Sequence, residues 1–152
     1  MFKIVEFIVT GLYVGKFKWA PGTMGTLLAV PLAYYMAGKG HVFYLQSTVL
    51  AIFASITLCT YYEIKSNSHD NKKVVVDEVV GFFVAYFWLP NRWQFLVSAF
   101  ILFRFFDILK PYPISYIDQK VKGGLGVVLD DLAAGLATNM ILQASTKVLL
   151  TL

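Results

Sequence analysis

Two long stretches of this 152-residue chain contain no Asp, Glu, Lys or Arg. They run from residue 19 to 38 and from 40 to 62, and a membrane-crossing helix needs about 20 apolar residues. The whole chain is 58% hydrophobic and 14% charged, whereas soluble domains average about 25% charged residues. The sequence therefore predicts an all-α, polytopic helical membrane protein that forms one domain over residues 1–152.

Three further apolar stretches cover residues 74–90, 93–109 and 125–150, and all three carry acidic residues. We expect about five hydrophobic helices in total, preceded by a short interfacial helix within residues 2–13. The stretches 74–90 and 93–109 are of marginal length, so each either crosses the membrane or lies partly buried and tilted at its surface.

The basic residues predict an orientation for five alternating spans. One side receives nine of them, and the other side receives Lys39, Arg92 and Lys147. The positive-inside rule then places the N-terminus in the cytoplasm. The same arrangement puts every charged or glycine-rich motif at a cytoplasmic helix end, which predicts one shallow site at the inner leaflet.

Four carboxylates stand inside apolar sequence as two adjacent pairs, Asp77-Glu78 and Asp130-Asp131. A charge at the bilayer centre costs about 2.5–3.5 kcal/mol, so such residues normally face a site rather than lipid. Oxygen ligands with few His or Cys residues suit Mg²⁺ and argue against zinc. Neighbours on a helix point about 100° apart, so each pair can direct one oxygen to a metal and use the other for a supporting role.

A second charged motif contains Arg104, Asp107 and Lys110, spaced along one face near the end of a predicted helix. A cation, an acid and a cation in a row can form a phosphate clamp. The alternative is an ion pair between Arg104 and Asp107 within the helix. Pro111 and Pro113 end that helix in either case.

Glycine-bearing loops precede two of the predicted helices. Gly22 and Thr23 open the first span, where free backbone N–H groups and a hydroxyl can meet an anion. Ordinary turn and capping chemistry explains the same residues equally well. Residues 123–126, Gly-Gly-Leu-Gly, let backbone approach a ligand closely but do not form a Walker loop.

Other reactive residue types are poor candidates. Cys59 lies well inside an apolar run and has no second cysteine to pair with, so we expect inert packing. His41 falls on the predicted outer side. His69 lies in a polar loop on the inner side, where it is either a loop residue or a general acid.

Four motifs in this order resemble the phosphatidylglycerophosphatase A family, and the match runs from about Lys16 to Gly135. The motifs are Ala20-Pro21-Gly22-Thr23-x-Gly25-Thr26, Asp77-Glu78-x-x-Gly81, Phe103-Arg104-x-x-Asp107-x-x-Lys110-Pro111-x-Pro113 and Gly123-Gly124-x-Gly126-x-x-x-Asp130-Asp131-x-x-Ala134-Gly135. The resemblance implies an all-helical, Mg²⁺-dependent lipid phosphatase of a bacterial inner membrane. Its substrate would be the anionic lipid phosphatidylglycerol phosphate, which would lose its terminal phosphate. The resemblance also pairs Asp70, in the polar loop, with a family acid that precedes the Asp-Glu pair.

Chemistry and resemblance together predict roles for the site residues. We expect Asp77, Glu78, Asp130 and Asp131 to hold the metal, and Asp107 to act with them in catalysis. Arg104, Lys110, Gly22 and Thr23 would bind the phosphate. The attacking group is either water or a carboxylate that forms an aspartyl phosphate.

Two other classes of protein remain open. A small cation or proton transporter would also carry intramembrane acids, but it should show polar groups along a path to both faces. A non-catalytic membrane subunit would use the charged pairs for assembly. We expect no nucleic-acid partner, and the sequence gives no oligomeric state.

Overall fold

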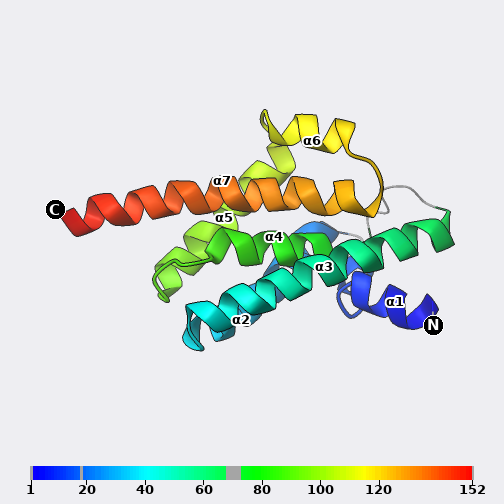
Figure 1. Cartoon of the computed structure of the whole chain (residues 1–152), viewed down its shortest axis with the longest axis horizontal. Helices are drawn as coiled ribbons and strands as arrows, with labels where there is room; N and C mark the ends of the chain where they lie inside the picture. The colour runs from blue at the N-terminus through cyan, green and yellow to red at the C-terminus, as the bar shows by residue number, and fades with distance from the viewer. Residues whose placement is uncertain (1, 18, 68–72, 152) are drawn as a thin grey trace.

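The computed structural model describes residues 2–17, 19–67 and 73–151, and over these ranges the chain is helical without a strand. His69 and Asp70 lie outside the described residues, as do Lys18 and Lys72. The described ranges form seven α-helices and one 3₁₀ turn, and the α-helices are labelled in Figure 1: α1 (Phe2–Val9), η1 (Val14–Lys16), α2 (Pro21–Gly38), α3 (His41–Ser66), α4 (Val76–Tyr86), α5 (Trp93–Leu109), α6 (Ile114–Lys120) and α7 (Gly123–Thr151).

The long helix α7 is the centre of the fold, because α3, α4, α5 and α6 all pack against it (Figure 1). Small side chains allow the helices of this bundle to pack closely. Ala29 and Ala33 of α2, Ala99 of α5 and Ala134 of α7 are fully buried. Small residues let helix backbones approach closely, which is the usual way helices associate inside membranes.

Two helices are long and apolar enough to cross a membrane, α3 over His41–Ser66 and α7 over Gly123–Thr146. This is fewer than the five spans predicted from the sequence. Helix α4 has 11 residues and is about 16 Å long, whereas the hydrocarbon core is about 30 Å thick. The stretch 74–90 is apolar because α4 is enclosed by other helices, with eight of its residues buried.

Much of the outer surface is apolar. On α3, Val42, Leu50 and Phe53 are 71%, 71% and 67% exposed. Exposed apolar side chains also lie on α1, α5 and the far half of α7, including Ile4, Ile101 and Met140. A surface this apolar suits lipid contact, and together with the two long helices it indicates membrane association.

Helices α4 and α5 form a helical hairpin, so the beginning of α4 lies beside the end of α5. The acidic first turn of α4 and the last turn of α5 both border one pocket. The start of α7 and the start of α2 border it as well. The fold thereby gathers four motifs that are far apart in the sequence.

Candidate active site

One polar pocket, with a volume of about 460 Å³, lies where five helices meet. It brings together eight of the nine site residues predicted from the sequence: Gly22, Asp77, Glu78, Arg104, Asp107, Lys110, Asp130 and Asp131. Thr23 is the ninth, and it is not among the described residues that line the pocket.

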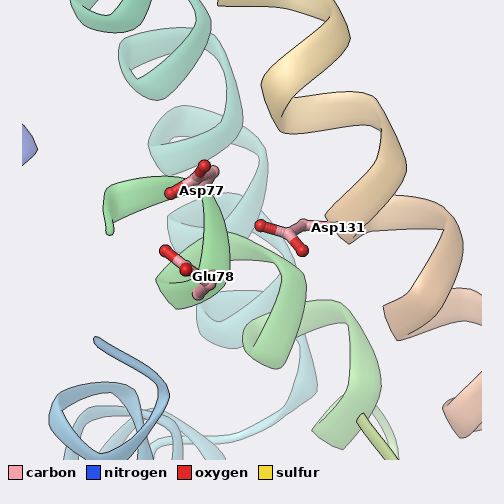
Figure 2. A group of neighbouring side chains, drawn as sticks. All are labelled: Asp77, Glu78 and Asp131. Carbon is pink, nitrogen blue, oxygen red and sulfur yellow. The ribbon is translucent and has the colours of Figure 1, made fainter. Parts of the chain in front are cut away.

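Three carboxylates form the centre of the pocket. Asp77 and Glu78 come from the first turn of α4 and Asp131 comes from α7, and one oxygen of each lies within 4.8 Å of the others (Figure 2). The first turn of a helix favours acidic side chains, because the free backbone N–H groups there carry partial positive charge.

Two glycines allow Asp131 to reach the α4 acids. A Cβ on Gly135 of α7 would lie 2.3 Å from the carbonyl oxygen of Gly81. A Cβ on Gly81 of α4 would lie 2.8 Å from the carbonyl oxygen of Asp131. No larger residue fits this crossing without moving the helices apart, so the predicted motif glycines set the distance between the acids.

Burial makes the ionised form of these three carboxyl groups unfavourable when no cation is near them. Asp77 is 7% exposed and Asp131 is 3% exposed. Burial raises the pKa of Asp77 and of Glu78, and the neighbouring carboxylates act against ionisation of Glu78 as well. Asp77 Oδ1 and Glu78 Oε2 are buried without a hydrogen-bond partner. Unpartnered, oxygen-only donors of this kind fit a hard divalent cation.

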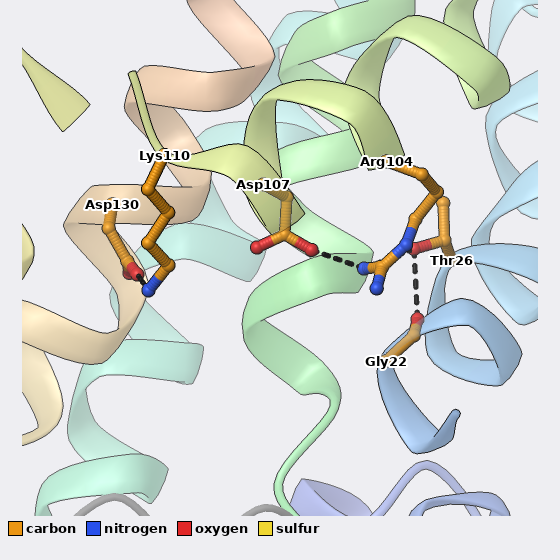
Figure 3. Close-up of polar contacts among 6 residues, drawn as sticks. All are labelled: Gly22, Thr26, Arg104, Asp107, Lys110 and Asp130. Carbon is orange, nitrogen blue, oxygen red and sulfur yellow. Dashed lines mark hydrogen bonds and ion pairs between the residues drawn. The ribbon is translucent and has the colours of Figure 1, made fainter. Parts of the chain in front are cut away.

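Arg104 lies beside these acids and is held from two sides. Its Nη1 atom donates to Asp107, which is the ion pair predicted as an alternative to the clamp, and it lies 3.5 Å from the Thr26 hydroxyl (Figure 3). Thr26 in turn donates to the carbonyl oxygen of Gly22 at 3.0 Å. Arg104 Nε is buried without a partner.

A side chain at Gly22 would displace the ends of two site residues, Glu78 and Arg104. A Cβ at this position would lie 2.3 Å from Glu78 Oε1 and 3.1 Å from both terminal nitrogens of Arg104. The first turn of α2 therefore packs directly on a central carboxylate and on the arginine. Thr26, one turn after Gly22, contacts Arg104 through its hydroxyl, whereas Thr23, which was predicted to bind the phosphate, does not line the pocket.

Lys110 reaches the pocket from beyond the end of α5 and not from its face. Its backbone is left-handed, with φ of 42°, and its N–H closes the helix on Phe106. Its ammonium group donates to Asp118 at 2.6 Å and to Asp130. Partial burial would lower the pKa of Lys110, but the bonds to these two carboxylates outweigh burial and raise it.

Asp130 thus differs from the other three predicted metal ligands, because one of its oxygens is paired with Lys110. Its other oxygen, Oδ1, is buried without a partner. The two pairs of adjacent acids therefore contribute differently to the central group. Asp77 and Glu78 both belong to it, whereas Asp131 belongs to it without Asp130.

The wall formed by α6 and the residues after it was not predicted from the sequence. Asp118 and Gln119 of α6 line the pocket, as does Lys122 beyond the end of α6, whereas only the helix stop at Pro111 and Pro113 was predicted in this part of the chain. Helix α6 buries Ile114, but its seven residues, Ile-Ser-Tyr-Ile-Asp-Gln-Lys, are too few to give a periodic signal in the sequence. In all, six acidic and three basic residues line the pocket.

Known proteins resemble the chain over most of its length. The sequence model described as "Phosphatidylglycerophosphatase A" matches residues 7–146. The Escherichia coli protein named phosphatidylglycerophosphatase A is 35% identical over 136 residues, which cover 89% of this chain and 79% of that protein. The Haemophilus influenzae protein of the same name is 36% identical over 134 residues, or 87% of this chain and 82% of that protein.

A third relative, from Bacteroides thetaiotaomicron, carries the provisional name phosphatidylinositol-3-phosphatase and is 31% identical over 149 residues, 93% of each chain. No solved structure gives a significant match. The four motifs that meet in the pocket lie inside the matched range, and this protein belongs to the phosphatidylglycerophosphatase A family.

Proposed function

We propose that this protein is a phosphatase of phospholipid biosynthesis that hydrolyses phosphatidylglycerol phosphate to phosphatidylglycerol and inorganic phosphate. The observation that carries the proposal is the pocket itself, where Asp77, Glu78 and Asp131 meet beside Arg104 and Lys110. Membership of the family supports this reaction over a transporter or a non-catalytic subunit.

The charge of the pocket supports a metal-dependent reaction. Six carboxylates and three basic groups give a formal charge of −3, and a phosphomonoester brings about two more negative charges at neutral pH. Such a substrate would be repelled unless cations are bound there. We assign Asp77, Glu78 and Asp131 as ligands of Mg²⁺. Asp130 lines the same pocket, and its Oδ1 atom is buried without a partner.

When bound, Mg²⁺ supplies positive charge that polarises the phosphoryl oxygens and lowers the pKa of a water molecule. Arg104 and Lys110 stabilise the negative charge that grows on the phosphoryl oxygens as the bond between phosphorus and the glycerol oxygen breaks. Asp107 holds the guanidinium of Arg104, and Asp118 holds the ammonium of Lys110. The attacking group is water, or a pocket carboxylate whose acyl phosphate water then hydrolyses, and the leaving glycerol oxygen takes up a proton.

We place the pocket at the cytoplasmic face of a bacterial inner membrane, with the chain crossing more than once. Basic residues at the pocket end of the helices, Lys110, Lys120 and Lys122, outnumber Lys39 and Arg92 at the opposite helix ends, which supports this side. Lys122 is exposed at the pocket, and no described residue pairs with it. It is available to the phosphodiester that joins the headgroup to the diacylglycerol, while the acyl chains stay in the membrane.

Phosphate release by the purified protein in detergent micelles tests the proposal. The substrates are short-chain phosphatidylglycerol phosphate and phosphatidylinositol 3-phosphate, each with Mg²⁺ and with a chelator. We expect Mg²⁺-dependent release from the first lipid and a loss of at least about 100-fold in Asp131→Asn, because a central carboxylate is removed. Glu6→Gln is the matched control, since Glu6 pairs with Lys16 and does not line the pocket.

Release that is equal with and without chelator would refute the metal assignment. Faster release from phosphatidylinositol 3-phosphate would refute the substrate assignment and would favour the activity suggested by the name of the Bacteroides relative.

A further inference from the structure

One face of α7 carries four residues at intervals of four: Asp131, Gly135, Asn139 and Gln143. Residues at this spacing lie above one another along a helix. All four contact α4 or the turn that follows it: Asp131 at the carboxylate cluster, Gly135 at the crossing with Gly81, and Asn139 and Gln143 at the far end.

The far end of α4 has an unusual need for partners. A helix leaves its last four carbonyl oxygens without intrahelical bonds, and apolar surroundings offer no water to satisfy them. In α4 these are the carbonyls of residues 83–86. The oxygens of Val84 and Tyr86 accept from the backbone N–H groups of Phe87 and Leu89 at 3.3 Å each.

The other two carbonyls depend on side chains of other helices. The hydroxyl of Tyr44 on α3 donates to the Phe83 oxygen at 2.9 Å. Asn139 Nδ2 on α7 donates to the Ala85 oxygen at 3.1 Å and to the Phe87 oxygen at 2.6 Å. Gln143 Nε2 lies 3.4 Å from the Phe87 oxygen and 3.3 Å from the Trp88 oxygen.

Helix α4 is therefore hydrogen-bonded to α7 at its carbonyl end, and its acidic end lies beside Asp131 of α7, 11 residues being all that separate the two ends. A slide of α4 along α7 would break the Asn139 bonds at one end and separate Asp131 from Asp77 and Glu78 at the other. The glycine crossing alone does not prevent such a slide, because it sets the distance between the helices and not their register.

We infer that Asn139 is a positioning residue for the active site. By capping the end of α4 it sets the register of α4 against α7, and it thereby aligns Asp77 and Glu78 with Asp131. This inference rests on the proposed metal site, and it assigns a function to a polar residue that lies outside the pocket lining.

The test is titration calorimetry of the purified full-length protein with Mn²⁺ alone, together with phosphate release. We expect Asn139→Leu to bind Mn²⁺ about tenfold more weakly and to lower kcat more than it changes KM, because the ligands are misaligned while the lipid surface is intact. Asn139→Gln keeps an amide donor and should recover part of the affinity. If only the volume of the side chain at position 139 mattered, Asn139→Leu and Asn139→Gln would bind Mn²⁺ equally well, and this result would count against the inference.

Thr138→Val is the matched control. Thr138 is fully buried one residue earlier, but its hydroxyl donates to Ala134 within α7, so the variant should bind Mn²⁺ normally. Should Asn139→Leu fail to fold, Gln143→Leu decides the matter, with an expected weakening of a few-fold. Unchanged Mn²⁺ affinity in the folded variants would overturn the inference. Absence of Mn²⁺ binding by the unmodified protein would instead refute the metal site, and the inference with it.

Discussion

Gly135→Ala should inactivate the protein by moving two helices apart. The new Cβ would lie 2.3 Å from the Gly81 carbonyl oxygen, whereas real Cβ contacts essentially never fall below 3.0 Å. The difference is at least 0.7 Å, and the atom that must move is backbone, so α4 and α7 have to separate by about that amount. Overpacking of this kind costs about 1–3 kcal/mol of stability.

The activation free energy should rise by an amount similar to the loss of stability, since a 100-fold fall in rate corresponds to about 2.7 kcal/mol. Asp131 lies one helical turn before Gly135, so the separation is transmitted directly to the distance between Asp131 and the α4 acids. A misplacement of about 1 Å at an active site can reduce a rate by about 100-fold. We therefore expect Gly135→Ala to remain folded at 25 °C while its kcat falls about 100-fold.

The assay is phosphate release at saturating lipid, with thermal unfolding followed in the same detergent. Gly38→Ala is the control, because a Cβ at Gly38 would meet only Asn91 Nδ2 at 3.8 Å. We expect this variant to keep full activity. Gly135→Ala that retains kcat within twofold of the unmodified protein would refute the reasoning, since the crossing would then tolerate a methyl group without moving Asp131.

Three further predictions concern neighbouring positions. Gly22→Ala should abolish activity, because its Cβ would lie 2.3 Å from Glu78 Oε1. Thr23→Ala should keep most of the activity. If phosphate release showed the reverse order, Thr23 would be the phosphate contact. Asp118→Asn should lower kcat by only about threefold to tenfold, because Lys110 loses one ion pair and keeps its bond to Asp130. A kcat equal to that of the unmodified protein would contradict the positioning of Lys110 by α6. Tyr44→Phe should lower the free energy of unfolding by about 1–3 kcal/mol, because it leaves the buried Phe83 carbonyl without the Tyr44 hydroxyl as donor. Denaturant titration measures this change, and an unchanged midpoint would show that another donor replaces the hydroxyl.

The convergence of the motifs could be predicted from the sequence, and the number of spans could not. Charged residues in apolar sequence are costly unless they meet one another, so Asp77, Arg104 and Asp131 were expected in one place, and the pocket contains all three. The hydrophobicity of a helix, in contrast, does not show whether lipid or other helices surround it. Helix α4 is as apolar as a span, but it faces α2, α5 and α7.

The position of Lys110 shows a second limit of the sequence. Spacing along an ideal helix placed it on the same face as Arg104 and Asp107, yet Pro111 ends α5 and the left-handed backbone of Lys110 turns the side chain toward Asp118 and Asp130. The helix end was predicted, but the direction of the side chain after it depends on α6. That helix was not anticipated, because its seven residues are too few to give a periodic pattern.

The same reasoning explains why the polar residues of α7 were not predicted to matter. Asp131 drew attention because it is charged, whereas Asn139 and Gln143 are neutral and are common enough in helices to pass without comment. Their spacing of four from Asp131 has meaning only once α4 is known to be short, since a helix that ends inside the protein needs donors at its carbonyl end. The brevity of α4 and the polar stripe of α7 are therefore one feature: the stripe supplies the side-chain donors that let α4 end at Tyr86 with its acids still facing Asp131.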